Sequence, residues 1–150
     1  MRVRATVVVI ATTLALTTAL TGCGSGEPAT SPAVATTKPK PASEGPDLAK
    51  ETFVDLTAEA EVLVDVRDNA FDEKYIEVKA GTPITFDNRG RTEHNVLPVT
   101  PGAFAQIDAD DLEPGVEQTL TFEVPGDYAY YCSLHGTKTK GMVGAVRVLE

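Results

Sequence analysis

Four side chains in this sequence can donate soft or borderline atoms to a metal ion. Cys132 and His135 are three residues apart, Met142 follows seven residues later, and His94 is the only other histidine in the chain. Thiolate and thioether sulfur favour Cu(I), whereas imidazole binds both oxidation states of copper. Because a tight turn can aim Cys132 and His135 at one point, we interpret the loop at residues 130–142 as one wall of a mononuclear copper site.

Other interpretations of these residues stay open at this point. Zinc also binds cysteine and histidine. The histidines would otherwise be ordinary polar loop residues, Cys132 a buried inert thiol, and Met142 a core residue at the start of an apolar strand over residues 142–148. A lone free thiol is a liability in an oxidising compartment unless a metal or burial protects it. The nearby His135 favours the metal site.

The N-terminal segment is typical of an exported lipoprotein. Arg2 and Arg4 precede an apolar, threonine-rich stretch over residues 7–20, which is too short and too weakly hydrophobic for a membrane span. Small residues stand directly before Cys23, as in the lipobox of bacterial lipoproteins. We therefore expect residues 1–22 to be a signal peptide and a lipidated Cys23 to anchor the protein to the outer face of the bacterial cytoplasmic membrane. An ordinary secretory signal with a chance cysteine is the alternative.

Composition divides the remainder of the chain into a tether and a domain. Residues 23–47 are rich in Gly, Ser, Pro, Thr and Ala with almost no large apolar side chain, so they bury too little surface to offset the entropy of ordering and should form a disordered tether. The formal net charge is -9, and lysine and arginine are not clustered. The basic footprint of a nucleic-acid-binding protein is therefore missing.

Residues 48–150 are predicted to form one all-β domain. Short strands alternate with turns rich in glycine and proline, and no long helical pattern is present, which favours an antiparallel β-sandwich. Residues 48–60 fit either a short helix or an edge segment, and residues 100–115 fit an irregular crossing loop or a short helix. Period-two alternation and apolar runs predict strands over residues 62–67, 75–79, 84–88, 119–124, 128–132 and 142–149.

Residues 61–150 resemble the cupredoxins, the blue copper proteins similar to plastocyanin and azurin. The resemblance rests on motifs at residues 68–71, 78–82, 86–88, 94–96, 125–128, 131–136 and 141–144. It implies a Greek-key sandwich that holds one copper ion per chain in a type 1 (blue) site and cycles between Cu(I) and Cu(II). His94, Cys132 and His135 would be the equatorial ligands and Met142 the weak axial ligand.

Two further expectations concern the surroundings of this site. Asn95 and Ser133 are candidates for tying the two ligand segments together and for hydrogen bonds near the Cys132 sulfur. Six residues separate His135 from Met142, more than in the plastocyanin pattern. Met142 can therefore reach the copper without being forced to do so.

The expected function is to shuttle single electrons between redox partners at the outer face of the membrane. An enzyme is not expected, because two histidines are too few for the extra copper centres of multicopper oxidases or nitrite reductases. An extracytoplasmic copper-handling or sensing protein is the alternative. We expect the protein to be a monomer. Its redox partner should be basic if the acidic loop at residues 108–113 is a docking patch. That loop is otherwise only solvated, and Lys138 and Lys140 offer a basic rim instead.

Overall fold

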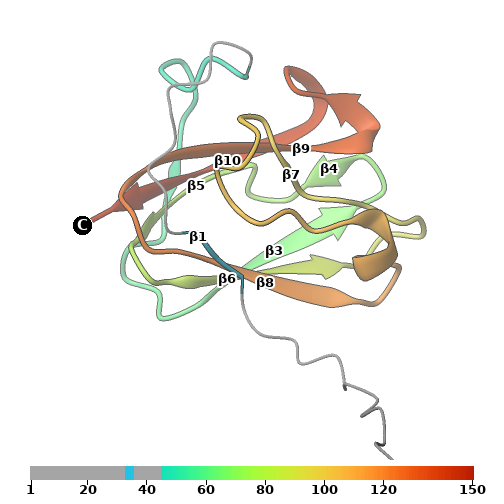
Figure 1. The fold of residues 1–150 in the computed structure, drawn as a ribbon, viewed down its shortest axis with the longest axis horizontal. Coiled ribbons are helices and arrows are strands. Elements are labelled where there is room, and N and C mark those ends of the chain that lie inside the picture. Colours follow the sequence, from blue (N-terminus) through green and yellow to red (C-terminus); the bar gives the residue numbers. More distant parts are fainter. Residues whose placement is uncertain (1–32, 36–44) are drawn as a thin grey trace, which may run out of the picture. The chain divides into compact units, whose positions relative to one another are not determined.

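Two β-sheets pack face to face in the part of the chain that the computed structural model describes, residues 33–35 and 45–150 (Figure 1). In spatial order, the first sheet contains β1 (Ala33–Ala35), β8 (Glu117–Phe122), β6 (Pro83–Asn88), β3 (Val62–Arg67) and β4 (Ala70–Phe71). The second contains β2 (Val54–Asp55), β5 (Tyr75–Lys79), β10 (Lys140–Leu149), β9 (Gly126–Thr137) and β7 (Leu97–Pro98). The described residues include no helix long and apolar enough to cross a membrane.

The all-β sandwich is confirmed, but its sheets are mixed and not purely antiparallel. The strand β3 pairs in parallel with β6, and β5 pairs in parallel with both β10 and β2. The chain leaves β3, passes through β5 in the opposite sheet, and then returns beside β3 as β6. Because the chain reverses direction twice between β3 and β6, these two neighbouring strands are parallel. The alternation of apolar and polar residues within a strand does not show that the chain crosses between the sheets.

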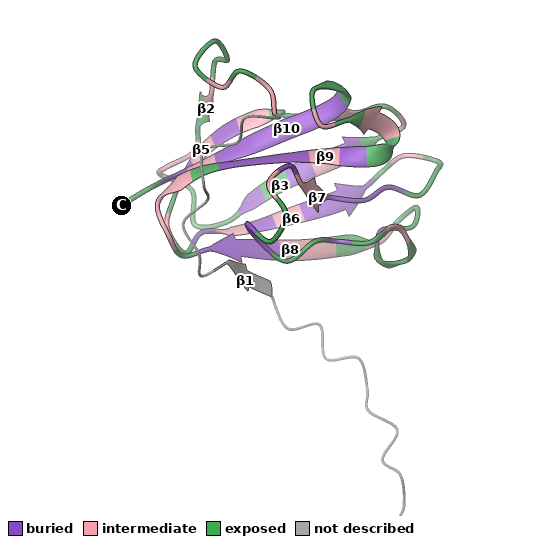
Figure 2. Ribbon diagram, turned by 45° about the horizontal axis from the view of Figure 1, so that its top comes forward, coloured by how far each residue is buried: buried purple, intermediate pink, exposed green. Residues whose placement is uncertain are grey.

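The core lies between the sheets (Figure 2), and strands such as β3 and β5 turn alternate side chains inward. Val62, Val64 and Val66 of β3 are buried while the residues between them are half-buried or exposed. In β9 the same period buries Tyr128 and Tyr130. Cys132 stands at the next inward position of β9, so regular strand geometry delivers its sulfur to the interior.

The two undecided segments are now assigned. Residues 45–53 form turns that lead into β2, and Phe53 packs on Tyr75 with a distance of 5.8 Å between the ring centroids. The guanidinium of Arg147 lies 3.9 Å from the centre of the Phe53 ring. The crossing segment contains one short 3-10 helix, Ala109–Asp111, as one of its two interpretations expected.

The predicted tether differs from expectation at one place. Ala33–Ala35 forms β1 and pairs in parallel with β8, Ala33 beside Leu120 and Ala35 beside Phe122. Without β1, β8 would be the edge of the first sheet and would present backbone groups that another strand can pair with. The signal peptide, Cys23 and tether residues 23–32 and 36–44 lie outside the described residues, so those expectations stay predictions.

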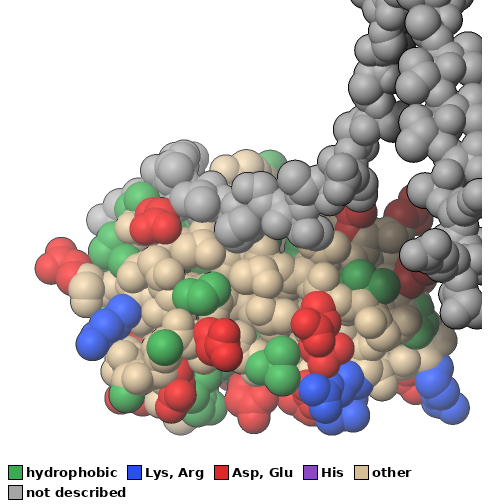
Figure 3. Space-filling view, turned by 90° about the horizontal axis from the view of Figure 1, so that it is seen from below, with side chains coloured by type: hydrophobic (Ala, Val, Ile, Leu, Met, Phe, Trp, Pro, Cys, Tyr) green, Lys and Arg blue, Asp and Glu red, His purple; other side chains and the backbone are tan. Residues whose placement is uncertain are grey.

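Charged side chains on the outside of the first sheet neutralise one another in register. Asp65 of β3 lies directly opposite Asp87 of β6, an arrangement of like charges that destabilises a sheet. The Nε atom of Arg89 lies 3.1 Å from an Asp65 oxygen and 2.6 Å from an Asp87 oxygen. Figure 3 likewise shows acidic side chains spread over one face of the molecule with basic side chains among them. No extended patch of one sign of charge is visible on this face.

Candidate metal centre

The segment predicted as a loop at residues 130–142 is instead a β-hairpin with a break in its pairing. The strands β9 and β10 pair at its tip, Thr137 with Lys140 and Gly136 with Gly141, and they pair again at Tyr131 with Val143. Between these points, residues 132–135 of β9 lie opposite Met142 alone. A bulge of this kind re-aims side chains that regular pairing would send to opposite faces. Cys132, His135 and Met142 all belong to it.

Two glycines allow the hairpin strands to close again beyond the bulge. A β-carbon on Gly136 would lie 2.7 Å from the Met142 nitrogen and 2.8 Å from the Lys140 oxygen. A β-carbon on Gly141 would lie 2.7 Å from the His135 oxygen, and Gly141 also has a positive φ of 83°. All three contacts are with backbone atoms, which cannot move aside as a flexible side chain can. The two glycines therefore fix the shape of the bulge.

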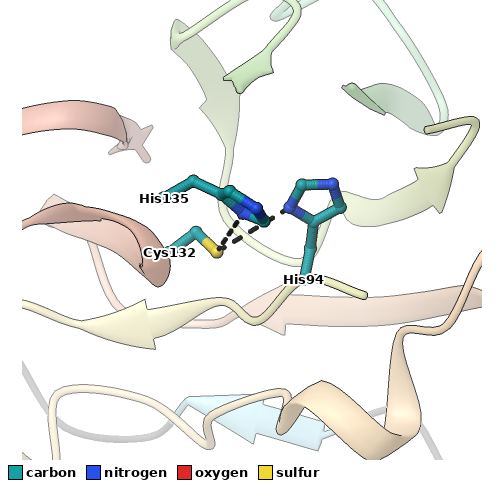
Figure 4. Close-up of side chains that lie close together, drawn as sticks. All are labelled: His94, Cys132 and His135. Atoms are coloured by element: carbon teal, nitrogen blue, oxygen red, sulfur yellow. Dashed lines mark hydrogen bonds between the residues drawn. The ribbon is translucent and has the colours of Figure 1, made fainter. Parts of the chain in front are cut away.

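His94 reaches the bulge from a separate segment. Its backbone nitrogen donates to the Leu112 oxygen at 3.2 Å, and its side chain is completely buried. Figure 4 shows the two imidazoles and the thiol converging on one point. The Cys132 sulfur lies 3.8 Å from Nδ1 of His94 and 3.6 Å from Nδ1 of His135. All three donor atoms lie within 4.8 Å of one another.

These distances fit a metal ion at the centre of the triangle. A metal about 2.3 Å from a thiolate and about 2.0 Å from two imidazoles, with roughly 120° between the bonds, holds each nitrogen about 3.7 Å from the sulfur. The two sulfur–nitrogen distances of 3.6 and 3.8 Å bracket this value. The trigonal set of two histidines and one cysteine is the donor set of blue copper sites. The two sulfur–nitrogen sides of the donor triangle therefore match this geometry.

The buried position of His94 also prepares it to bind a metal. Burial lowers the pKa of His94, the neighbouring His135 lowers it further, and the carboxylate of Asp68 opposes both effects. A lowered pKa keeps the ring neutral at pH 7, and a metal ligand must be neutral imidazole. Since Nδ1 of His94 faces the Cys132 sulfur, this nitrogen is the one placed to bind the metal.

The two ligand segments are joined beside the site by a reciprocal pair of hydrogen bonds. The Nδ2 atom of Asn95 donates to the Ser133 hydroxyl at 2.9 Å, and the Ser133 backbone nitrogen donates to Oδ1 of Asn95 at 2.8 Å. Each of these residues directly follows a ligand, His94 or Cys132. The pair therefore ties the two segments together, which is one of the two roles expected of these residues. The other role, hydrogen bonds near the Cys132 sulfur, stays a prediction.

Met142 shares its environment with Cys132. Its side chain is buried in the same hydrophobic cluster, and its backbone lies opposite the four bulged residues. That position is compatible with an axial ligand and with plain packing. The structure thus brings together His94, Cys132 and His135 and leaves the role of Met142 as a proposal.

Comparison with known proteins decides the family. A profile of the copper-binding proteins of the plastocyanin/azurin family matches residues 58–149, more than half of the chain. The chain belongs to this family. It is a cupredoxin, and copper is the metal that His94, Cys132 and His135 hold.

Relatives of this cupredoxin include chloroplast plastocyanins. The plastocyanin of Tetradesmus obliquus is 31% identical over 107 residues, which cover 67% of this chain and 68% of that protein. The plastocyanin of Hordeum vulgare is 34% identical over 85 residues, or 52% of this chain and 54% of its own length. The cupredoxin thus spans between about half and two thirds of these relatives.

Solved structures agree with the fold. A substituted amicyanin in its Cu(I) form aligns with a TM-score of 0.52 and 26% identity, covering 71% of this cupredoxin and 94% of the amicyanin. A copper-containing nitrite reductase from Thermus scotoductus aligns with a TM-score of 0.50 and 27% identity over 60% of this cupredoxin but only 22% of the reductase. The same fold therefore also occurs as part of a much larger protein.

Several residues that shape or hold the site were not indicated by the sequence. Gly136 and Gly141 flank the tip of the hairpin symmetrically, and this symmetry is the one signal that would have revealed them. The Leu112 carbonyl accepts a hydrogen bond from the His94 backbone nitrogen. Because any residue has a backbone carbonyl, the leucine at this position does not indicate that role. Asp68 accepts three hydrogen bonds from Arg91, which lies 23 residues later in the chain. Such a pair cannot be found from local spacing.

We expect Gly141→Ala to damage the copper site and Gly115→Ala to leave it intact. Both glycines have a φ near +80°, but a β-carbon on Gly115 meets nothing within 4 Å. The control should cost about 1–2 kcal/mol of unfolding free energy through backbone strain alone. Gly141→Ala should cost more and release copper more readily, because the new methyl group clashes with His135. Urea unfolding and copper titration measure both effects, and equal losses in the two variants would contradict the role given to Gly141.

Proposed function

We propose that this cupredoxin carries single electrons between redox partners. When bound, copper supplies the redox change by cycling between Cu(I) and Cu(II). The observation that carries the proposal is the fixed triangle of donors from two segments. The hairpin bulge sets Cys132 and His135, and the bonds between Asn95 and Ser133 hold the His94 segment against them. Donors that stay in place in both oxidation states make electron exchange fast.

His135 is the proposed port for electrons. Its side chain is half-buried, whereas His94 and Cys132 are fully buried. An open hollow at the surface includes His135 and Leu134, and the Leu134 side chain is exposed. A partner that covers this hollow would bring its own redox centre close to a copper ligand.

The rim of the hollow supports a basic redox partner. Glu93 and Glu113 line it, and the one basic residue on the rim, Arg91, is paired with Asp68 at 2.6 Å. The chain as a whole carries a formal net charge of -9. Opposite charge on a partner speeds encounter at low ionic strength. We propose no catalysis, because two histidines are too few for a second copper centre.

The electron-carrier proposal predicts fast self-exchange between the Cu(I) and Cu(II) forms through the His135 face. Adding a little Cu(II) protein to Cu(I) protein should broaden the NMR signals of the ligand residues in proportion to the fraction added. Leu134→Glu should slow this exchange by about tenfold or more, because it places like charges where two molecules meet. Leu63→Glu on the outside of β3 is a matched control, since Leu63 is exposed to 49% and Leu134 to 48%.

Slow self-exchange in the unmodified protein, together with very tight retention of Cu(I), would contradict electron carriage. It would favour a copper-handling or sensing protein at the cell exterior instead. A rate that is equally reduced by both glutamate substitutions would contradict the His135 port.

We also propose Met142 as the weak axial ligand. Met142→Leu should then keep the visible charge-transfer colour, which comes from Cys132, and raise the reduction potential, because loss of a weak thioether donor favours Cu(I) over Cu(II). Voltammetry of the copper-loaded variant measures the potential. A potential equal to that of the unmodified protein would show that Met142 only packs in the core.

Finally, we propose that Cys23 carries the lipid anchor at the outer face of the cytoplasmic membrane. The residues before Cys23 support this proposal, and two or more acyl chains give stable anchoring. Labelled palmitate should enter the full-length protein in bacterial cells and should be absent from the Cys23→Ala variant. Equal labelling of both proteins would refute this site.

A further inference from the structure

We infer that Asn88 is a positioning residue that holds His94 in place for copper. Asn88 is the last residue of β6, and its side chain is completely buried. Its Nδ2 atom donates to the Thr92 oxygen at 2.9 Å and to the Leu112 oxygen at 2.8 Å. Its Oδ1 atom accepts from the Gly90 nitrogen at 2.9 Å. One side-chain amide thus holds three backbone groups.

The Leu112 carbonyl connects Asn88 to the copper ligand. This carbonyl accepts one hydrogen bond from the Asn88 amide and another from the His94 backbone nitrogen, at 3.2 Å. The two donors therefore meet at one oxygen atom. Without the Asn88 amide, the carbonyl groups of Leu112 and Thr92 would each lose one hydrogen bond. Thr92 stands two residues before His94, so this loss would loosen the segment that carries the imidazole.

Regular backbone pairing does not hold this part of the chain. Residues 89–95 belong to no strand or helix, in contrast to Cys132 and His135, which lie within β9. The Asn95 and Ser133 pair fixes the segment on the far side of His94. Asn88 fixes it on the near side, so His94 is held between two asparagines. Side-chain hydrogen bonds on both sides of His94 therefore take the place of the regular strand pairing that holds Cys132 and His135.

The inference predicts a specific defect when the Asn88 amide is removed. His94 gains freedom while Cys132 and His135 stay fixed by the hairpin. A loosened imidazole stabilises Cu(I), which accepts fewer ligands, so the reduction potential rises. The inference depends on copper binding at His94 and does not depend on which partners exchange electrons with the protein.

The test compares Asn88→Ser with Ile84→Val. Ile84 is fully buried in the same strand and pairs with Val62 and Leu120, away from the His94 segment, so its substitution costs stability without touching that segment. In the copper-free protein, the His94 amide should exchange its hydrogen about tenfold faster in Asn88→Ser, relative to the amides of the core strands, because a buried hydrogen-bond network is lost. In Ile84→Val, the exchange rate of the His94 amide relative to the amides of the core strands should stay as it is in the unmodified protein.

The copper-loaded proteins give the second measurement. Asn88→Ser should raise the reduction potential and shift the sulfur-to-copper absorption, and Ile84→Val should do neither. If Asn88→Ser does not fold, Asn88→Gln keeps a neutral amide and displaces it by one methylene group, so it disturbs the same three hydrogen bonds without adding a buried charge. An Asn88 variant with unchanged His94 exchange and unchanged potential, or with the same changes as Ile84→Val, would overturn the inference. If the protein did not bind copper at all, the exchange measurement on the copper-free protein would still decide the role of Asn88.

Discussion

The site depends on the break in pairing between β9 and β10. A strand that paired without interruption would turn Cys132 inward and His135 outward, because they are an odd number of residues apart. The bulge places four residues of β9 opposite Met142 alone, and this local excess of chain brings His135 back over Cys132. The sandwich below supplies rigidity, and glycines at 136 and 141 let the strands pair again beyond the bulge.

Local features of the sequence were sufficient to predict one half of this arrangement. A strand was predicted over residues 128–132, and the structure has these residues in β9 with the Cys132 side chain buried. The strand at residues 75–79 was predicted to the residue. The hairpin beyond His135 was not predicted, because threonine, lysine and glycine at residues 136–141 look like a polar loop. Only pairing with the opposite strand shows that they continue β9 and β10.

The other half of the site depends on contacts between residues distant in the sequence. His94 could be proposed as a ligand because it is one of only two histidines, yet nothing near it shows how it is held. Its position depends on the Leu112 carbonyl, which lies 18 residues away and accepts a hydrogen bond from the His94 backbone nitrogen. Parallel pairing of β3 with β6 escaped prediction for the same reason, since strand direction depends on a crossing between sheets. Sequence patterns thus indicated His94, Cys132 and His135, and the structure shows how their side chains are brought together.

In this cupredoxin, one sulfur and two imidazole nitrogens bind a single copper ion. This coordination can be measured by X-ray absorption spectroscopy at the copper edge, on protein loaded with one equivalent of copper. We expect one short sulfur shell from Cys132 and two imidazole nitrogens in both the Cu(I) and Cu(II) forms, with metal–ligand distances that change little between the two forms. A copper environment of nitrogen and oxygen alone, or a coordination number that changes strongly on reduction, would contradict it.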